Sequence, residues 1–93
     1  MQLAVDRQHA AARVNLGVVR RARGDRAGAI ALYTEALGLD SDSADAYFDL
    51  ANALAQRGDR DGAVRHEREA LRVRPDYPAA ANMLRRALDS RPP

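Results

Sequence analysis

A segment of 34 residues occurs twice in this chain. When residues 10–43 are aligned with residues 44–77, 13 of the 34 positions carry the same amino acid, including Arg-Gly-Asp-Arg at 23–26 and 57–60. Chance would give about three or four matches in a chain this rich in alanine and arginine. A partial third copy begins at Pro78, with these residues in register: Ala80, Leu84, Ala87, Leu88 and Arg91. The fold is therefore constrained to a stack of similar units.

Each full copy has the apolar spacing of two helices. In the second copy, apolar residues recur every three or four positions in two runs separated by Gly58-Asp59. Glycine just past a helix end adopts the left-handed conformation readily, and aspartate can then cap the amides of the next helix. The spacing predicts helices at 10–23, 27–39, 44–57, 61–74 and 78–90.

The composition agrees with closely packed helices. Alanine accounts for 20 of the 93 residues and only four residues are aromatic, so small side chains have to build most of the core. The length fits one domain over residues 1–93. No cysteine is present, which excludes disulfides and thiolate metal sites. The N-terminus carries charges and no apolar run reaches 18 residues, so we expect a cytoplasmic protein without a membrane segment.

In its period of 34 residues and in the residues that recur, the chain resembles the tetratricopeptide repeat family. The matching residues in the first copy are Gly17, Gly24, Asp25, Ala29, Ala36 and Leu37. In the second copy they are Ala51, Gly58, Asp59, Ala63, Ala70, Leu71 and Pro75. The resemblance implies an all-α, right-handed superhelical solenoid of antiparallel helix pairs, with about five helices. It assigns repeat 1 to residues 10–43, repeat 2 to residues 44–77 and a capping helix to residues 78–91.

Three charged residues depart from the family pattern. Arg13, Arg20 and Glu67 stand where large packing residues are usual. Because charges are rarely buried without partners, we expect these side chains to remain solvated or to form ion pairs. Residues 2–7 are either the remnant of an earlier repeat or an extension of the first helix.

The resemblance also implies a binding surface. In this family the first helices of successive repeats line a concave groove that accepts a peptide or a partner's helix. The partner-binding candidates at groove positions are Val14, Asn15, Val18, Asp45, Phe48, Asp49, Asn52, Gln56, Asn82, Met83 and Arg86. Asparagine both donates and accepts hydrogen bonds, which suits a peptide backbone. The alternative is that the asparagines are ordinary solvated residues and that Phe48 packs against its neighbours.

Other chemistries find little support. The chain has no lysine for a phosphate loop, and Ala70 stands where a zinc-protease signature beginning at His66-Glu67 needs its second histidine. An adhesive Arg-Gly-Asp needs an exposed loop on a secreted protein. The Gly24/Gly28 pair lies across a polar corner and not in an apolar span, which excludes dimerisation of membrane helices through this pair. We therefore expect no enzyme and no cofactor.

The hypothesis is a non-catalytic module that binds a protein or peptide partner. One alternative is self-assembly into a homo-oligomer through an open end of the stack, or a place within a longer repeat array. Another is binding of nucleic acid or an anionic surface by Arg65, Arg68 and Arg72. The net charge of only +2, with acidic and basic residues interspersed, argues against nucleic acid.

Overall fold

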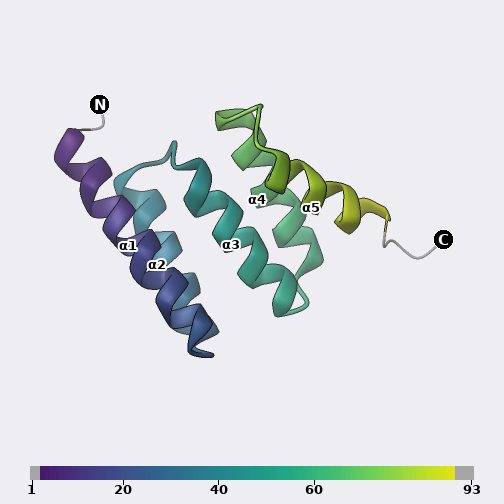
Figure 1. The fold of residues 1–93 in the computed structure, drawn as a ribbon, viewed down its shortest axis with the longest axis horizontal. Helices are drawn as coiled ribbons and strands as arrows, with labels where there is room; N and C mark the ends of the chain where they lie inside the picture. Colours follow the sequence, from purple (N-terminus) through teal and green to yellow (C-terminus); the bar gives the residue numbers. More distant parts are fainter. Residues whose placement is uncertain (1–2, 90–93) are drawn as a thin grey trace.

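The computed structural model describes residues 3–89, which form five helices joined by short turns (Figure 1). The helices are α1 (Ala4–Ala22), α2 (Arg26–Leu39), α3 (Ala44–Gln56), α4 (Arg60–Val73) and α5 (Pro78–Asp89). The expected all-α solenoid is the observed fold. Four helices begin within one residue of their predicted positions, whereas α1 begins six residues earlier. The predicted end of the last helix at residue 90, and of the capping helix at residue 91, lies outside the described residues.

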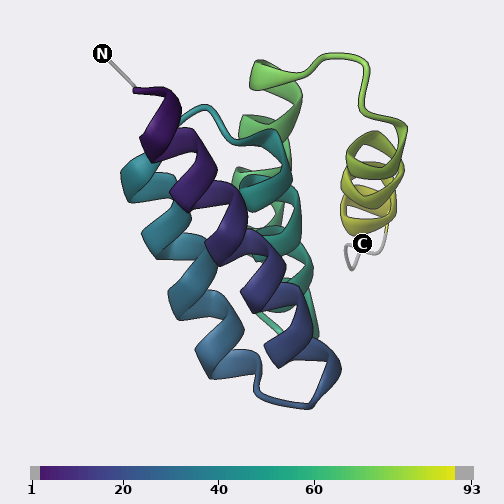
Figure 2. The same cartoon turned by 60° about the vertical axis from the view of Figure 1, so that its left-hand side comes forward.

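The helices pack mainly on their neighbours along the chain. α1 lies against α2 and α3 against α4, while contacts of α2 with α3 and of α4 with α5 join the stack. α1 and α3 lie side by side, with α2 behind α1 and α4 behind α3, and α5 packs on α4 (Figure 1). Turned by 60°, the same fold shows α5 on the side of α4 that is away from α1 and α2 (Figure 2). None of the described helices is both long enough and apolar enough to span a membrane.

The doubled Arg-Gly-Asp-Arg segments are the turns within the two helix pairs. Gly24 has φ 88° and Gly58 has φ 91°, the left-handed conformation that the sequence predicts. The carboxylate of Asp25 accepts a hydrogen bond from the Gly28 amide at 2.9 Å, and Asp59 accepts one from Gly62 at 3.0 Å. A Cβ at Gly28 or Gly62 would collide with that carboxylate. Gly28 and Gly62, each two residues after its Arg-Gly-Asp-Arg segment, therefore leave room for the cap.

Small side chains allow the first helix pair to approach closely. Tyr33 of α2 is fully buried, and its ring lies directly over Gly17 of α1. A Cβ at Gly17 would lie 2.5 Å from Cε1 of Tyr33, so only glycine fits beneath the ring. The surrounding core is largely alanine, from these residues: Ala10, Ala29, Ala36, Ala46, Ala51, Ala53 and Ala63.

The expectation for Glu67 is wrong. This residue occupies in α4 the position that Tyr33 occupies in α2, and its side chain is 1% exposed. Its Oε2 atom has no hydrogen-bond partner within the described structure, and desolvation raises the pKa of the carboxyl group. The helix packing points this position inward whatever residue stands there, so the carboxyl group is carried into the core.

The other two departures behave as predicted. Arg13 forms an ion pair with Glu35 at 3.4 Å, and Arg20 forms one with Asp25 at 3.2 Å, both in partly exposed surroundings. Residues 4–9 continue α1 without a break, so within the described residues the segment before residue 10 is an extension of the first helix. Residue 2 lies outside them.

Candidate partner-binding surface

A pocket of about 280 Å³ opens between the first half of α1 and the start of α3. It contains three of the predicted binding residues, Val14, Asn15 and Asp45. Val14 is a buried core residue that forms part of the apolar floor, whereas the Asn15 side chain is exposed. The remaining lining residues are Arg7, Ala10, Ala11, Asp40, Asp42, Ser43, Ala44 and Arg74. The pocket thus combines both signs of charge with an amide.

Asp45 is held by the connection between α4 and α5. The Tyr77 hydroxyl donates a hydrogen bond to Asp45 Oδ1 at 2.9 Å, and Arg74 forms an ion pair with the same oxygen at 3.2 Å. The Arg74 guanidinium lies 4.7 Å from the centre of the Tyr77 ring. Burial and the hydrogen bond to Asp45 raise the pKa of Tyr77. One side of the pocket is therefore fixed by residues that come 29 and 32 positions after Asp45.

Phe48 contacts the same connection. Its ring centre lies 5.1 Å from that of Tyr77, and both side chains are half-buried. The sequence predicts Phe48 and Asp45 as surface residues but not Arg74 and Tyr77, because Arg74 is the last residue of the helix predicted at 61–74 and Tyr77 falls in the connection after it. The signal available was that Tyr77 is one of only four aromatic residues.

Asp49 lies one helical turn beyond Asp45 on α3. Burial raises the pKa of its carboxyl group to about 6, Arg21 of α1 acts in the opposite direction, and Asp45 contributes to the rise. Among the described residues no ion pair forms on Asp49. The Nε atom of Arg21 is buried and has no hydrogen-bond partner in the described structure. The Asp49 carboxyl group is therefore partly desolvated, and the charge of Arg21 offsets only part of the rise in its pKa.

The remaining predicted residues are distributed along α1, α3 and α5 outside the pocket. Val18 is 36% exposed on α1, while Asn52 is half-buried and Gln56 exposed on α3. On α5 the Asn82 oxygen accepts a hydrogen bond from Arg85 at 2.8 Å, Met83 is half-buried and Arg86 is exposed.

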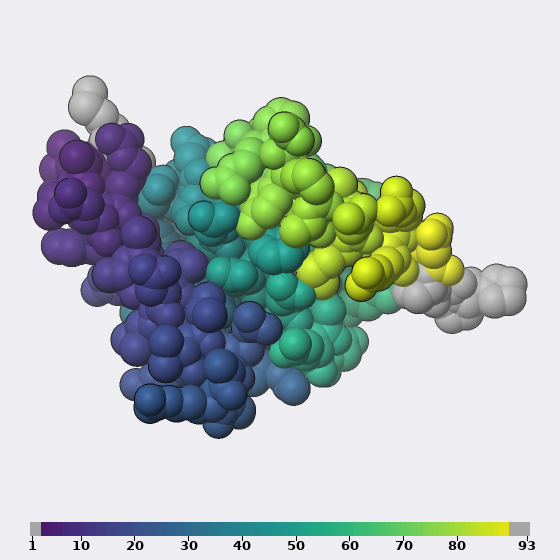
Figure 3. All heavy atoms as spheres, viewed as in Figure 1, coloured from purple at the N-terminus to yellow at the C-terminus, as the bar shows by residue number. Residues whose placement is uncertain are grey.

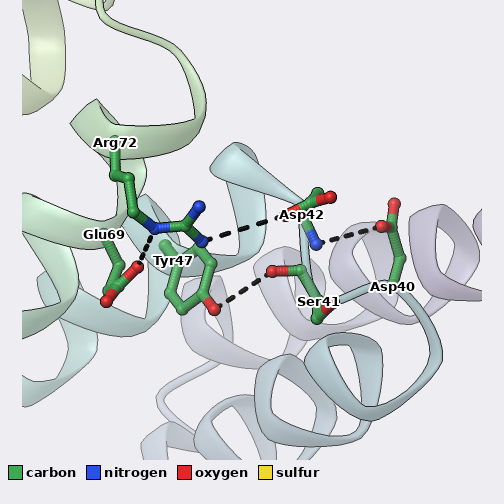
Figure 4. A network of polar contacts seen from close by, with 6 residues as sticks. All are labelled: Asp40, Ser41, Asp42, Tyr47, Glu69 and Arg72. Atoms are coloured by element: carbon green, nitrogen blue, oxygen red, sulfur yellow. Dashed lines mark hydrogen bonds and ion pairs between the residues drawn. The ribbon is translucent and has the colours of Figure 1, made fainter.

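The arginine stripe on α4 is partly neutralised. Arg72 forms ion pairs with Glu69 at 2.6 Å and with Asp42 at 3.8 Å (Figure 4). Within residues 3–89 the Glu69 carboxylate therefore pairs with Arg72 and not with Arg65, the other arginine near it on α4. The loop before α3 is further ordered by a hydrogen bond from the Tyr47 hydroxyl to the Ser41 carbonyl oxygen at 3.1 Å. Arg65 and Arg68 are exposed. Arg72, one of the three arginines that would bind an anionic ligand, is thus already paired with two carboxylates.

The part of the chain that the structure describes contains no group of three or more histidine, aspartate or glutamate side chains placed to hold a metal ion.

Comparison with known proteins identifies the repeat. The family model for the tetratricopeptide repeat matches residues 20–88, which is most of the chain. The chain belongs to the tetratricopeptide repeat family. This family consists of helical repeats that generally serve as protein-interaction modules. A search of curated proteins found no significant match.

Solved structures agree with this assignment. The chain is similar to a subunit in the crystal structure of the APC/C hetero-tetramer Cut9–Hcn1, with a TM-score of 0.84, 26% identity and 89% of this chain covered. It is also similar to MamA, with a TM-score of 0.83, 24% identity and 90% covered. For the UNC-45 chaperone, which binds and folds muscle myosin, the values are 0.81, 28% and 88%. The chain spans only 16%, 46% and 9% of those three chains.

Proposed function

We propose that this tetratricopeptide repeat protein binds a peptide or an extended segment of a partner protein along the face formed by α1, α3 and α5, without catalysing a reaction. The observation that carries the proposal is the pocket between α1 and α3, where exposed Asn15 and paired Asp45 stand over the buried Val14. A peptide backbone alternates donors and acceptors, which an asparagine amide can match, while Val14 supplies an apolar floor.

The flanking groups add specificity. Arg7 and Arg74 offer donors for carbonyl or carboxylate groups, and Asp42 and Asp45 offer acceptors. The half-buried ring of Phe48 extends the surface along α3 toward Asn52. The residues proposed to make contact beyond the pocket are Val18, Asp49, Asn52, Gln56, Asn82, Met83 and Arg86.

Selection from a random peptide library tests the proposal, because the partner is unidentified. Peptides selected on the wild-type protein should lose at least tenfold in affinity for Asn15→Ala and for Phe48→Ala, measured by isothermal titration calorimetry. Arg68→Ala changes an exposed residue on α4 and should leave binding unchanged. Peptides that tolerate both changes on α1 and α3 but lose affinity for Arg68→Ala would overturn the proposal.

A further inference from the structure

Polar groups from three helices come together between α1 and α3. They belong to Arg21 of α1, Tyr33 of α2 and Asp49 of α3. Burial raises the pKa of Tyr33, while the Arg21 guanidinium lowers it and the Asp49 carboxylate raises it further. Burial also raises the pKa of Asp49, and Arg21 lowers it. Each of the three groups therefore acts electrostatically on another, and we call these three residues the polar cluster.

The polar cluster lacks partners within residues 3–89. Tyr33 is 0% exposed and its hydroxyl has no hydrogen-bond partner, nor does the buried Nε atom of Arg21. The two groups are thus close without being aligned for a hydrogen bond. The Asp49 carboxylate forms no ion pair in the described structure. Since unpartnered buried polar groups are unfavourable, a ligand that hydrogen-bonds here gains affinity.

The polar cluster continues the candidate partner-binding surface. Arg21 lies seven residues after Val14 and three after Val18, so the three side chains share one side of α1. Asp49 lies one turn after Asp45 on α3, and α1 contacts α3. Figure 3 shows α1, in purple to blue, beside the teal surface of α3. Because Arg21 and Asp49 are half-buried, a side chain of a bound segment reaches them more easily than its backbone does.

The opposite charges of Arg21 and Asp49 favour a neutral ligand group that both donates and accepts hydrogen bonds. A carboxylate would be attracted to Arg21 and repelled by Asp49, and a cation would meet the reverse. A carboxamide suits both residues, because its oxygen can accept from Arg21 while its NH₂ group donates to Asp49. We propose that the polar cluster binds the side-chain amide of an asparagine or glutamine in the partner segment. This inference rests on the proposed function and specifies what the surface recognises.

The polar cluster occurs once in the two repeats. The residues 34 positions after Arg21, Tyr33 and Asp49 are Ala55, Glu67 and Met83. Alanine and methionine carry no charge, so the second helix pair and α5 do not repeat the arrangement. A segment that carries one such amide therefore has one register along the surface.

Binding should depend on pH in a defined direction. The amide donates to the ionised carboxylate of Asp49, so a proton competes with the ligand. Burial raises the pKa of Asp49 to about 6, and affinity should therefore fall by about tenfold between about pH 7.5 and about pH 5. The groups that act electrostatically with Asp49 are Arg21, Tyr33, Asp45 and Tyr77. A carboxylate ligand would show the opposite trend.

Peptides selected from a random library on the wild-type protein at about pH 7.5 test the proposal. One position should be enriched in asparagine or glutamine, and replacing that residue by leucine or methionine should weaken binding at least tenfold in isothermal titration calorimetry. Arg21→Met should weaken binding by a similar factor. Arg23→Met is the matched control, since it changes an exposed arginine just after α1 and should leave affinity unchanged. Asp49→Asn should abolish the pH dependence.

The outcomes separate this inference from the proposed function. Selection of no peptide would contradict the proposed function and this inference with it. Peptides that bind without an enriched amide, that bind Arg21→Met like the wild type, or that bind more tightly at about pH 5 would overturn only the role of the polar cluster. Circular dichroism checks that Arg21→Met folds; if it does not, the pH profiles of the wild type and Asp49→Asn decide.

Discussion

The two helix pairs have nearly the same turn and different interiors. In α1 and α2, the ring of Tyr33 lies over Gly17, whereas the equivalent positions of α3 and α4 hold Glu67 and Ala51. The larger side chain, that of Tyr33, is thus matched with a glycine, and the smaller one, that of Glu67, with an alanine. The repeat thus fixes the volume shared by the two positions and leaves its division between them open, even to a carboxyl group.

Replacing the ring should have the largest effect. Tyr33→Ala removes a fully buried aromatic side chain and should lower the free energy of unfolding by about 3–5 kcal/mol, measured by urea denaturation. Tyr47→Ala is the control, because Tyr47 is half-buried and should cost less. If the two variants lost equal stability, the ring over Gly17 would not anchor the first pair.

Filling the space beneath the Tyr33 ring should have the next largest effect on the free energy of unfolding. Gly17→Ala places a methyl group against Tyr33 and should cost about 1–3 kcal/mol, although alanine is favoured in helices. In a Tyr33→Ala background the same change should become neutral or stabilising. A double-mutant cycle measures this coupling, and additive effects would refute the paired packing.

Removing the buried carboxyl group should stabilise the second pair. Glu67→Leu replaces a polar group that lacks a partner and should raise the free energy of unfolding by about 1–2 kcal/mol at pH 7.

The pH dependence of Glu67 follows from its raised pKa. The folded state binds the proton more tightly than the unfolded chain, whose ordinary value is 4.5, so the contribution of Glu67 is full below pH 4.5 and is lost as pH rises through the folded-state pKa. The melting temperature of Glu67→Gln, compared with wild type, should therefore improve with rising pH. Asp49→Asn should show the same direction of change, because burial raises the pKa of Asp49 to about 6. A constant difference between Glu67→Gln and wild type would mean that Glu67 does not titrate in this range.

The turns are alike in the two helix pairs, so substitutions there should have similar effects on stability, and these should be the smallest of the series. Gly24→Ala and Gly58→Ala each force a side chain into the left-handed region and should each cost about 1 kcal/mol. Arg57→Gln loses only an exposed ion pair to Asp59 at 3.7 Å and should stay within about 0.5 kcal/mol of wild type. Thermal denaturation compares the three variants. Unequal losses at the two glycines would show that the turns are not equivalent.

The turns and four of the helix starts could be predicted because they depend on residues close together in sequence. Gly58 and Asp59 specify the second turn without help from the rest of the molecule. The sequence allows two starts for α1, because the repeat register begins the first helix at residue 10 while residues 4–9 contain nothing that stops a helix. The structure selects the earlier start, at Ala4.

The candidate partner-binding surface was less predictable. Arg74 and Tyr77 reach Asp45 only because the connection after α4 crosses the start of α3, and no local pattern encodes that crossing. Glu67 was misjudged for a related reason. The rule that charges avoid burial describes averages, whereas helix packing determines which positions face inward.

The packing of each helix mainly on its neighbours along the chain has a kinetic consequence. Helices that meet soon after they form require only short loops to close, so the entropy lost before the first favourable contact is small. Helical proteins with such local contacts fold in about microseconds to milliseconds. One helix pair can therefore nucleate the structure and the remaining helices can add to it in turn, with the unfolded ends exposed only briefly.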